Sequence, residues 1–266
     1  MTGAGDMTMP LPGGLDAGRT AAFAELVAQI AGAAPLRSLP YLAPALLFAN
    51  ASVQDRLDMP HAAADQILVQ EYQGITYLDA VPPGADLVAT ASAQHKASGA
   101  AYRFALADRD GNGIAQLDAT LRLFPADDLA AVKPMRLRPD MLGDAEWSGE
   151  VSVPQSAIDT YLALSGDGNP IHSDARQAAA LGLAAPVVPG LLLISLSQPI
   201  CEMALPGTAL ASLKARFLAP LCADQAFRIA LQQRGRAAGT DHHKLRAYMI
   251  GSDDRVLAIA DLQVQS

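Results

Sequence analysis

The sequence predicts an α+β protein built from two similar halves, each with an apolar helix followed by an antiparallel set of strands. Two observations support this fold class. The order of a helical segment and then several short strand-like runs occurs once before residue 126 and again after residue 148. The segment that begins at Gly190 is also apolar on nearly every side, which is typical of a buried helix. A curved antiparallel sheet wrapped around such a helix accounts for both observations.

The first half is predicted to begin after a loose, Gly- and Pro-rich tail at residues 1–18 and to form a domain over residues 19–125. Its helical pattern covers residues 19–34, and a second apolar helix is predicted over residues 41–54. Short runs bounded by turn residues then predict strands at 65–79, 85–96, 100–110 and 114–124. Residues 126–148 lose this periodicity and are interpreted as a linker.

The second half, residues 149–266, repeats the order of the first. It contains a predicted strand at 149–154, a short helix at 156–166, a polar loop, and the buried helix at 190–205. Four strands are predicted to complete the chain, at 210–220, 225–235, 243–251 and 256–265. The two halves share little literal sequence, so the prediction of a duplication rests on the order of elements.

The composition limits the classes of partner. The chain has 266 residues, of which 51% are hydrophobic, and a formal net charge of −8, which argues against general binding to nucleic acid or to anionic membranes. The most apolar stretch, residues 181–200, is interrupted by Pro186, Pro189 and Gly190, and its uninterrupted part is too short to span a bilayer. The start of the chain lacks the features of a signal peptide, and Cys201 and Cys222 fit buried thiols in a reducing compartment. We therefore expect a cytoplasmic protein with no nucleic-acid or membrane partner.

The polar loop "SGDGNPIH", residues 165–172, contains the residue types needed for proton transfer. Asp167 and His172 form a natural pair for moving protons near neutral pH. Pro170 stiffens the turn and pushes Asn169 out of helical geometry, and the Asn169 amide could orient either partner or a water. A purely structural interpretation is also open, because Ser, Gly, Asp, Asn and Pro all favour turns.

Gly190 adds a second candidate group. It lies 18 residues after His172, at the predicted start of the buried helix. Backbone N–H groups at a helix start lack intrahelical partners and carry positive partial charge, so the Gly190 N–H could stabilise a developing oxyanion. An ordinary helix start is the alternative, because Pro and Gly are both common there.

The motif Y-x-x-x-S-G-D-G-N-P-I-H at 161–172, followed by "AAPVVPGLL" at 184–192, resembles the hydratase motif of the MaoC-like R-specific enoyl-CoA hydratases and 3-hydroxyacyl dehydratases. The segment "ARFLAPLCADQAF" at 215–227 is also similar to that family. The likeness covers most of residues 20–266 and is sharp over about 161–220. It implies a double hot-dog fold, in which two antiparallel sheets each wrap a central apolar helix.

The resemblance also implies roles for individual residues. Asp167 and His172 take the positions of the catalytic pair, while Asn169, Ser165 and Gly190 take those of orienting or oxyanion-binding groups. This chain departs from the family pattern at two places. It has Pro189 where the family usually has His, and it has Asp224-Gln225 where the family usually has a Gly-Asp pair. The first half has no comparable loop, which implies that only the second half is catalytic.

The activity implied by the resemblance is reversible hydration of trans-2-enoyl-CoA to (3R)-3-hydroxyacyl-CoA, with Asp167 and His172 sharing one water. The CoA thioester is the substrate, and no metal or redox cofactor is required. The first half is expected to supply the pocket for the acyl chain, and the chain is expected to act alone or as a homodimer. Three alternatives stay open: a dehydratase for acyl carrier protein substrates, a non-catalytic protein that binds acyl thioesters, and a thioesterase.

Two other motifs resemble metal sites only in part. The segment "DRDGNG", residues 108–113, matches the opening of a calcium-binding loop, but Ala119 stands where the closing Glu is needed, so we predict a hairpin turn. The segment "DHH", residues 241–243, has no spaced third ligand and is also interpreted as a turn. No metal site is therefore predicted.

Overall fold

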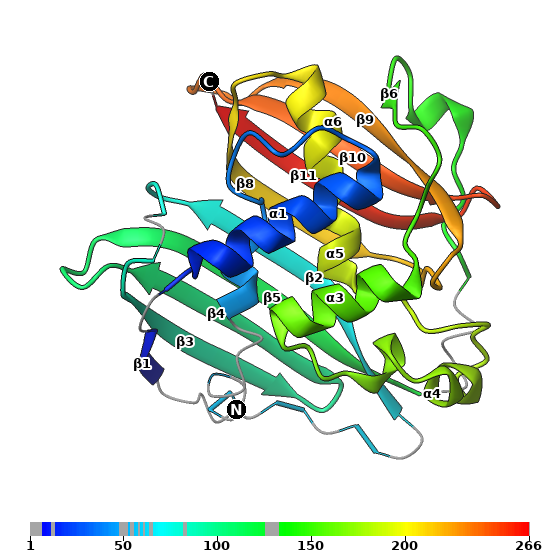
Figure 1. The fold of residues 1–266 in the computed structure, drawn as a ribbon, viewed down its shortest axis with the longest axis horizontal. Helices are drawn as coiled ribbons and strands as arrows, with labels where there is room; N and C mark the ends of the chain where they lie inside the picture. The colour runs from blue at the N-terminus through cyan, green and yellow to red at the C-terminus, as the bar shows by residue number, and fades with distance from the viewer. Residues whose placement is uncertain are drawn as a thin grey trace.

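The computed structural model describes residues 7–11, 14–47, 53, 56–57, 59–60, 62–63, 66–81, 84–125 and 133–265. The strands in these ranges form an 11-stranded antiparallel sheet with the order β1-β3-β4-β5-β2-β8-β11-β10-β9-β6, in which β7 also pairs with β9 (Figure 1). The strands of the first half are β1 (Met7–Leu11), β2 (Gln66–Tyr77), β3 (Leu87–Lys96), β4 (Gly99–Ala107) and β5 (Gly113–Pro125). Those of the second half are β6 (Glu146–Trp147), β7 (Val151–Ser152), β8 (Ala209–Phe217), β9 (Ala226–Arg236), β10 (His243–Gly251) and β11 (Val256–Gln265).

The two halves are joined by the pairing of β2 with β8. Tyr72 lies opposite Arg216, and Thr76 lies opposite Ser212 in this antiparallel pair. The sheets that the sequence predicts for the two halves are therefore continuous across the molecule. Hydropathy patterns could not predict this junction, because they show which face of a strand is buried but not which strand lies next to it.

The strands predicted from the sequence are confirmed in both halves. In β4 the alternation is clear, because Tyr102, Phe104 and Leu106 are buried while Arg103 between them is exposed. The predicted turn at residues 108–113 is also confirmed. There the Asp108 carboxylate accepts hydrogen bonds from the backbone N–H groups of residues 110 and 112, which closes the hairpin between β4 and β5.

The buried helix predicted over residues 190–205 is confirmed in position but not in continuity. It consists of α5 (Gly190–Ser195) and α6 (Ser197–Ala204), which meet at Leu196. Pro199 accounts for the break, because a proline ring clashes with the carbonyl four residues earlier and has no N–H to donate to it. That carbonyl belongs to Ser195, the last residue of α5.

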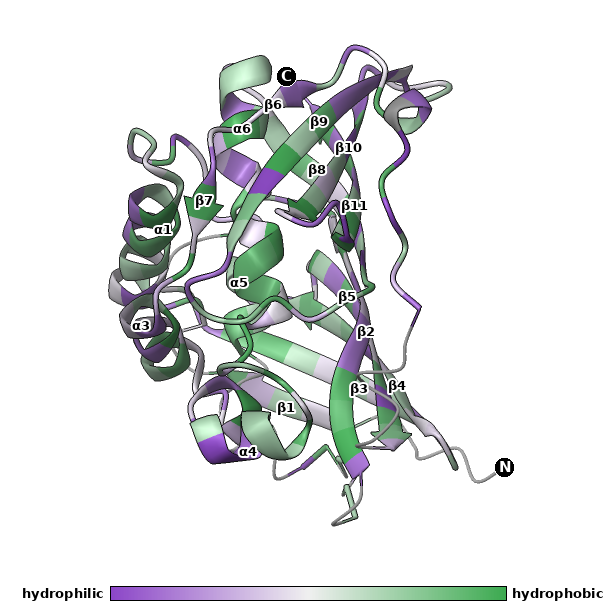
Figure 2. Cartoon of the chain, turned by 90° about the vertical axis from the view of Figure 1, so that its right-hand side faces the viewer, coloured by the Kyte–Doolittle hydropathy of each residue, from purple (hydrophilic) through white to green (hydrophobic). Residues whose placement is uncertain are grey.

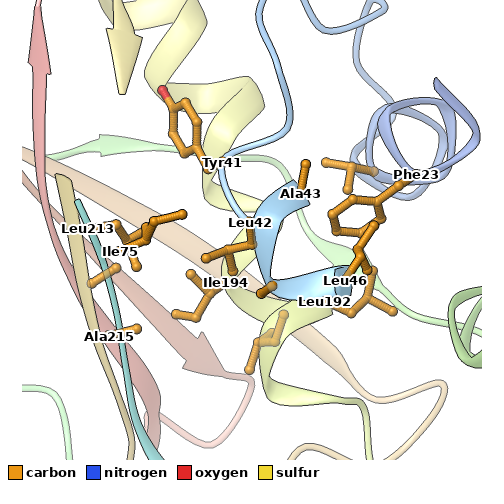
Figure 3. Close-up of a cluster of buried hydrophobic side chains, with 14 of the residues drawn as sticks. Phe23, Tyr41, Leu42, Ala43, Leu46, Ile75, Leu192, Ile194, Leu213 and Ala215 are labelled. Carbon is orange, nitrogen blue, oxygen red and sulfur yellow. The ribbon is translucent and has the colours of Figure 1, made fainter. Parts of the chain in front are cut away.

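The first half begins with the predicted helix, α1 (Ala17–Ala31). The second predicted helix, over residues 41–54, is wrong where the structure describes it: Ala43–Leu47 form the 3-10 helix η1, and most of the remaining predicted residues lie outside the described ranges. Pro44 cannot donate a backbone hydrogen bond, which disfavours a regular α-helix here. Figure 3 shows Leu42, beside η1, packed in the core next to Ile194 of α5.

The helices cover one face of the sheet. Helix α5 lies between the sheet and an outer pair of helices, α1 and α3 (Gln155–Ser165), which run side by side (Figure 2). The 3-10 helix η4 (Pro170–His172) and helix α4 (Ala175–Ala180) follow α3. No helix among the described residues is both long and apolar enough to cross a membrane. The two cysteines are buried and free, which confirms the prediction of buried thiols.

Two segments that we predicted to be irregular contain regular structure. Within the predicted tail, Met7–Leu11 form β1, which pairs with β3, and α1 already begins at Ala17. The described part of the predicted linker crosses the sheet face opposite the helices (Figure 2), where Leu142 packs with Tyr248 and neighbouring apolar side chains. This part also contains the 3-10 helix η3 (Pro139–Met141). A few apolar residues without periodicity are enough to attach such a segment, which is why its pattern looked irregular.

Candidate functional site

The polar loop starts where α3 ends. Gly166 adopts the left-handed conformation, with φ of 73°, and its N–H bonds the Leu162 carbonyl at 2.8 Å. This is a common way to end a helix, and glycine adopts the conformation at little cost. The chain then turns sharply, because the Asp167 N–H donates to Ser165 Oγ at 3.2 Å and the Asn169 N–H donates to Asp167 Oδ1 at 3.0 Å. One carboxylate oxygen of Asp167 thus holds the turn, and the other is available for a different partner.

The second part of the loop places His172. Asn169 is extended, as expected before proline, and its Oδ1 accepts a hydrogen bond from the Ile171 N–H at 3.3 Å, so it caps η4. Ile171 is buried in a small apolar cluster with Ile67 and Val187. The turn therefore has a capped start and an anchored centre, and His172 projects from its end.

Asp167 and His172 lie close together. His172 Nε2 is 3.8 Å from Asp167 Oδ2, and the side chains are 13% and 32% exposed. The other ring nitrogen, Nδ1, lies 2.7 Å from the Val187 carbonyl, which can only accept a hydrogen bond. The proton of the neutral ring is therefore on Nδ1, and Nε2 presents its lone pair towards Asp167.

The separation of this pair suits one shared water. Two atoms 3.8 Å apart can both lie about 2.8 Å from the same water oxygen, at an angle of roughly 85°. That angle is close enough to the shape of a water molecule for it to donate one hydrogen to each atom. The arrangement can hold a water and remove its proton at the same time.

Asn169 and Ser165 make contacts that support the loop. The Asn169 side chain caps η4 and in this way positions His172 through the backbone. Ser165 is buried, and its hydroxyl holds the Asp167 N–H and hydrogen-bonds Tyr161. Burial raises the pKa of Tyr161, the nearby charge of Asp167 raises it further, and the hydrogen bond with Ser165 opposes the rise. Tyr161 therefore stays neutral and acts as a buried support.

Three supports of the loop were missed by sequence reasoning. They are Tyr161, the Val187 carbonyl, and Gln155, whose Nε2 donates to the His172 carbonyl at 2.9 Å. The spacing of Tyr161 and Ser165 by four residues on a helix could have indicated their contact. The other two contacts join residues 15 and 17 positions apart, and no periodic pattern relates them.

Gly190 is the first residue of α5, as predicted, with Pro189 as the N-cap residue. The N–H groups of the first helical turn have no intrahelical acceptor, so they point out of the helix start. The bond from His172 to the Val187 carbonyl brings the imidazole to a segment only three residues before this start. The polar loop thus contacts the segment that leads into α5.

A glycine is also required at position 190 by packing. A Cβ atom built there would lie 2.7 Å from Cε1 of the Phe217 ring, far inside van der Waals contact. We expect Gly190→Ala to lower the free energy of unfolding by about 1–3 kcal/mol, measured by urea denaturation, because the ring or the helix must move. Gly149→Ala is the matched control, since Gly149 is exposed and nothing lies within 4 Å of its Cβ position. Adding Phe217→Leu should restore part of the loss, and equal stabilities of the two alanine variants would contradict this account.

The turn at residues 222–225 explains one departure from the family pattern. Asp224 has φ of 62°, and Gln225 Oε1 accepts a hydrogen bond from the Cys222 N–H at 3.1 Å. The left-handed conformation favours glycine, which the resemblance places at position 224, and Asp tolerates it better than most other residues. The turn is therefore kept with a different residue.

Comparison with known proteins shows that most of the second half is similar to a known domain family. Residues 140–252 match the family model described as "MaoC like domain". The peroxisomal multifunctional enzyme type 2 of Drosophila melanogaster is 31% identical over 112 residues, which are 41% of this chain and 18% of that protein. The chain therefore spans less than a fifth of the length of this curated relative.

Two solved structures cover nearly the whole chain. One, named "MaoC-like dehydratase", has a TM-score of 0.72 at 15% identity over 98% of this chain and 97% of its own. The other is a conserved hypothetical protein of Mycobacterium tuberculosis described as a double hot-dog fold, with a TM-score of 0.63 at 14% identity over 98% of this chain and 96% of its own. At such low identity the likeness concerns the fold, and it confirms the predicted fold class.

Proposed function

We propose that the chain is a hydro-lyase that reversibly hydrates trans-2-enoyl-CoA to (3R)-3-hydroxyacyl-CoA, a proposal supported by the match of residues 140–252 to the MaoC-like domain model. The observation that carries the proposal is the 3.8 Å separation between His172 Nε2 and Asp167 Oδ2. Both residues lie within the matched segment. The similarity to a peroxisomal multifunctional enzyme supports the same class of chemistry.

In the proposed mechanism the pair holds one water against carbon 3 of the enoyl group. One member of the pair accepts the water proton as the oxygen attacks carbon 3, and a proton is delivered to carbon 2. His172 exchanges protons through Nε2, because Nδ1 is held by the Val187 carbonyl. The thioester oxygen becomes negative during the attack, and we assign its stabilisation to the Gly190 N–H at the start of α5. The reaction transfers no electrons overall, so it requires no redox cofactor.

The first half has a small cavity beside the start of α1, and we keep as a prediction that this half binds the acyl chain. The cavity has a volume of about 120 Å³ and is lined by mostly apolar residues of the first half, namely Leu15, Ala17, Thr20, Leu39 and Val81. An apolar cavity of about 150 Å³ can bind benzene. Arg19, between two of the lining residues, contacts the Leu164 carbonyl just before the polar loop.

The alternatives differ in what they require of the site. A protein that only binds acyl thioesters has no need for two proton-transfer groups around one water. A thioesterase would release free thiol, and a dehydratase for carrier-protein substrates must bind a partner that is usually acidic, against this chain's net charge of −8. We therefore place CoA thioesters first. A cytoplasmic location stays a prediction, and so does action as a monomer or homodimer.

One assay distinguishes these functions. Purified protein is incubated with crotonyl-CoA, with longer enoyl-CoAs, and with the same enoyl groups on acyl carrier protein. We expect loss of the enoyl chromophore without release of free thiol, and a (3R)-hydroxyacyl product by chiral analysis. Thiol release would indicate a thioesterase, faster turnover on the carrier protein would indicate the dehydratase, and binding without turnover would contradict the enzymatic proposal.

A further inference from the structure

We propose that Arg19, in the non-catalytic first half, is a positioning residue for Asp167. The expected effect of Arg19 on the reaction rate rests on the proposed function. The contacts of Arg19 do not depend on that function. Arg19 lies in the first turn of α1, and its side chain reaches the last turn of α3, immediately before the polar loop.

The contact of Arg19 is with the end of α3. Its Nε lies 3.1 Å from the Leu164 carbonyl oxygen, and its Nη2 donates to the same oxygen. This carbonyl is one of the last in the helix and has no intrahelical partner, so the guanidinium satisfies it. The negative end of the helix dipole lies here too, and α3 has no basic residue of its own in its last turn. The first half supplies the cation that α3 lacks.

A second contact from α1 meets the same turn of α3. Phe23 lies four residues after Arg19 and so on the same face of α1. Its ring packs against Tyr161 with centroids 5.9 Å apart, and both side chains are almost fully buried. The last turn of α3 is thus held by a polar contact and an apolar contact from one helix of the other half.

From this turn, a short chain of hydrogen bonds leads to the carboxylate. Tyr161 bonds Ser165, Ser165 Oγ accepts the Asp167 N–H, and Asp167 Oδ1 accepts the Asn169 N–H. The His172 ring is held by the Val187 carbonyl, and the His172 carbonyl accepts a hydrogen bond from Gln155 at the start of α3. The distance between the two side chains therefore depends on where α3 ends. Because a misplacement of about 1 Å can cost on the order of 100-fold in rate, the support of this turn matters for catalysis.

The test uses the full chain and three variants: Arg19→Met, Arg19→Lys, and Arg103→Met as the control. Arg103 is also in the first half, but it is exposed and pairs with Asp118 on the sheet. We expect Arg19→Met to lower kcat for crotonyl-CoA about 10- to 100-fold with little change in KM. Arg19→Lys keeps the charge but not the paired donors, so it should recover part of the loss. Arg103→Met should match the unchanged protein.

A second measurement is independent of activity. Amide hydrogen exchange should become faster in Arg19→Met over residues 164–172 and stay unchanged elsewhere, because the loop loses its support while the core does not. If the unchanged protein shows no hydration, the proposed function fails, while this measurement still tests the contact. The positioning role is overturned if kcat and local exchange are both unchanged in Arg19→Met. It is also overturned if exchange rises across the whole chain, which would indicate general destabilisation.

Discussion

Asp167→Asn and His172→Gln are each expected to lower kcat/KM for crotonyl-CoA by about 100- to 10,000-fold, the usual contribution of a general acid–base group. Both changes keep nearly the same size and the ability to hydrogen-bond. An amide at position 167 cannot carry the negative charge, and an amide at position 172 cannot exchange a proton near neutral pH. The water between the two groups would still fit the site but would not be activated.

The effects of substituting Asp167 and His172 on the rate should also not be additive. Because both residues act on the same water, the double variant is expected to be little slower than the worse single variant. Two matched controls are available outside the site. Asp174→Asn changes the N-cap residue of α4, where Asn serves as well as Asp, and His242→Gln changes a histidine in the turn before β10. Near-normal turnover in either Asp167→Asn or His172→Gln would show that the pair is not the catalytic one.

The second large effect concerns a buried carboxylate far from the polar loop in sequence. Glu202 on α6 is 9% exposed and holds the segment between α1 and η1. It accepts hydrogen bonds from the Arg37 N–H at 2.9 Å, the Ser38 hydroxyl at 2.7 Å and the Gln198 side chain at 2.9 Å. A charge-assisted network of this kind joins the first half of the chain to the central helix of the second.

We expect Glu202→Ala to lower the free energy of unfolding by about 3 kcal/mol, since several buried donors lose their acceptor at once. Urea denaturation at neutral pH measures the change. Glu25→Ala is the control, because Glu25 is exposed on α1 and should shift stability by less than about 0.5 kcal/mol. A loss in Glu202→Ala no larger than in this control would show that the network does not stabilise the junction.

The same carboxylate predicts a pH dependence. Burial acts to raise the pKa of Glu202, but the hydrogen bonds from Arg37, Gln198 and Ser38 together hold it below its ordinary value of 4.5. When the pKa of a carboxyl is lower in the folded protein than in the unfolded chain, its ionisation stabilises the folded protein. This stabilisation is complete at pH values above the unfolded-state pKa and is lost as the pH falls through the folded-state pKa. The stability difference between the unchanged protein and Glu202→Gln should therefore be constant above about pH 5 and shrink below pH 4.5. A constant difference down to pH 3 would contradict this assignment.

Most of the helices and strands could be predicted because their formation depends on residues that are neighbours in the sequence. Alternation over short runs predicted the strands, and the apolar segment after Gly190 predicted a buried helix, since burial on every side is a property of the segment itself. The two errors within helices both involve proline. Pro44 and Pro199 interrupt segments whose hydropathy alone looked helical, and their effect on the backbone outweighed the pattern.

The candidate pair was accessible to sequence reasoning for the same reason. Asp167 and His172 are five residues apart in one loop, and a proline between them limits how the backbone can turn, so their convergence is nearly a local property. Gly190 could be assigned to a helix start, but its packing against Phe217 could not, because that contact joins a helix to a strand.

Residues close together in the chain encode most of the strands and helices, and they place the acid and the imidazole in one turn. These features follow from the steric preferences and polarity of those residues. Contacts between distant residues, by contrast, pair β2 with β8, hold the His172 ring at the Val187 carbonyl, and bring Arg19 of the first half to the turn before Asp167. Such contacts depend on how distant surfaces fit once water is excluded between them, and no local pattern of residues encodes that fit.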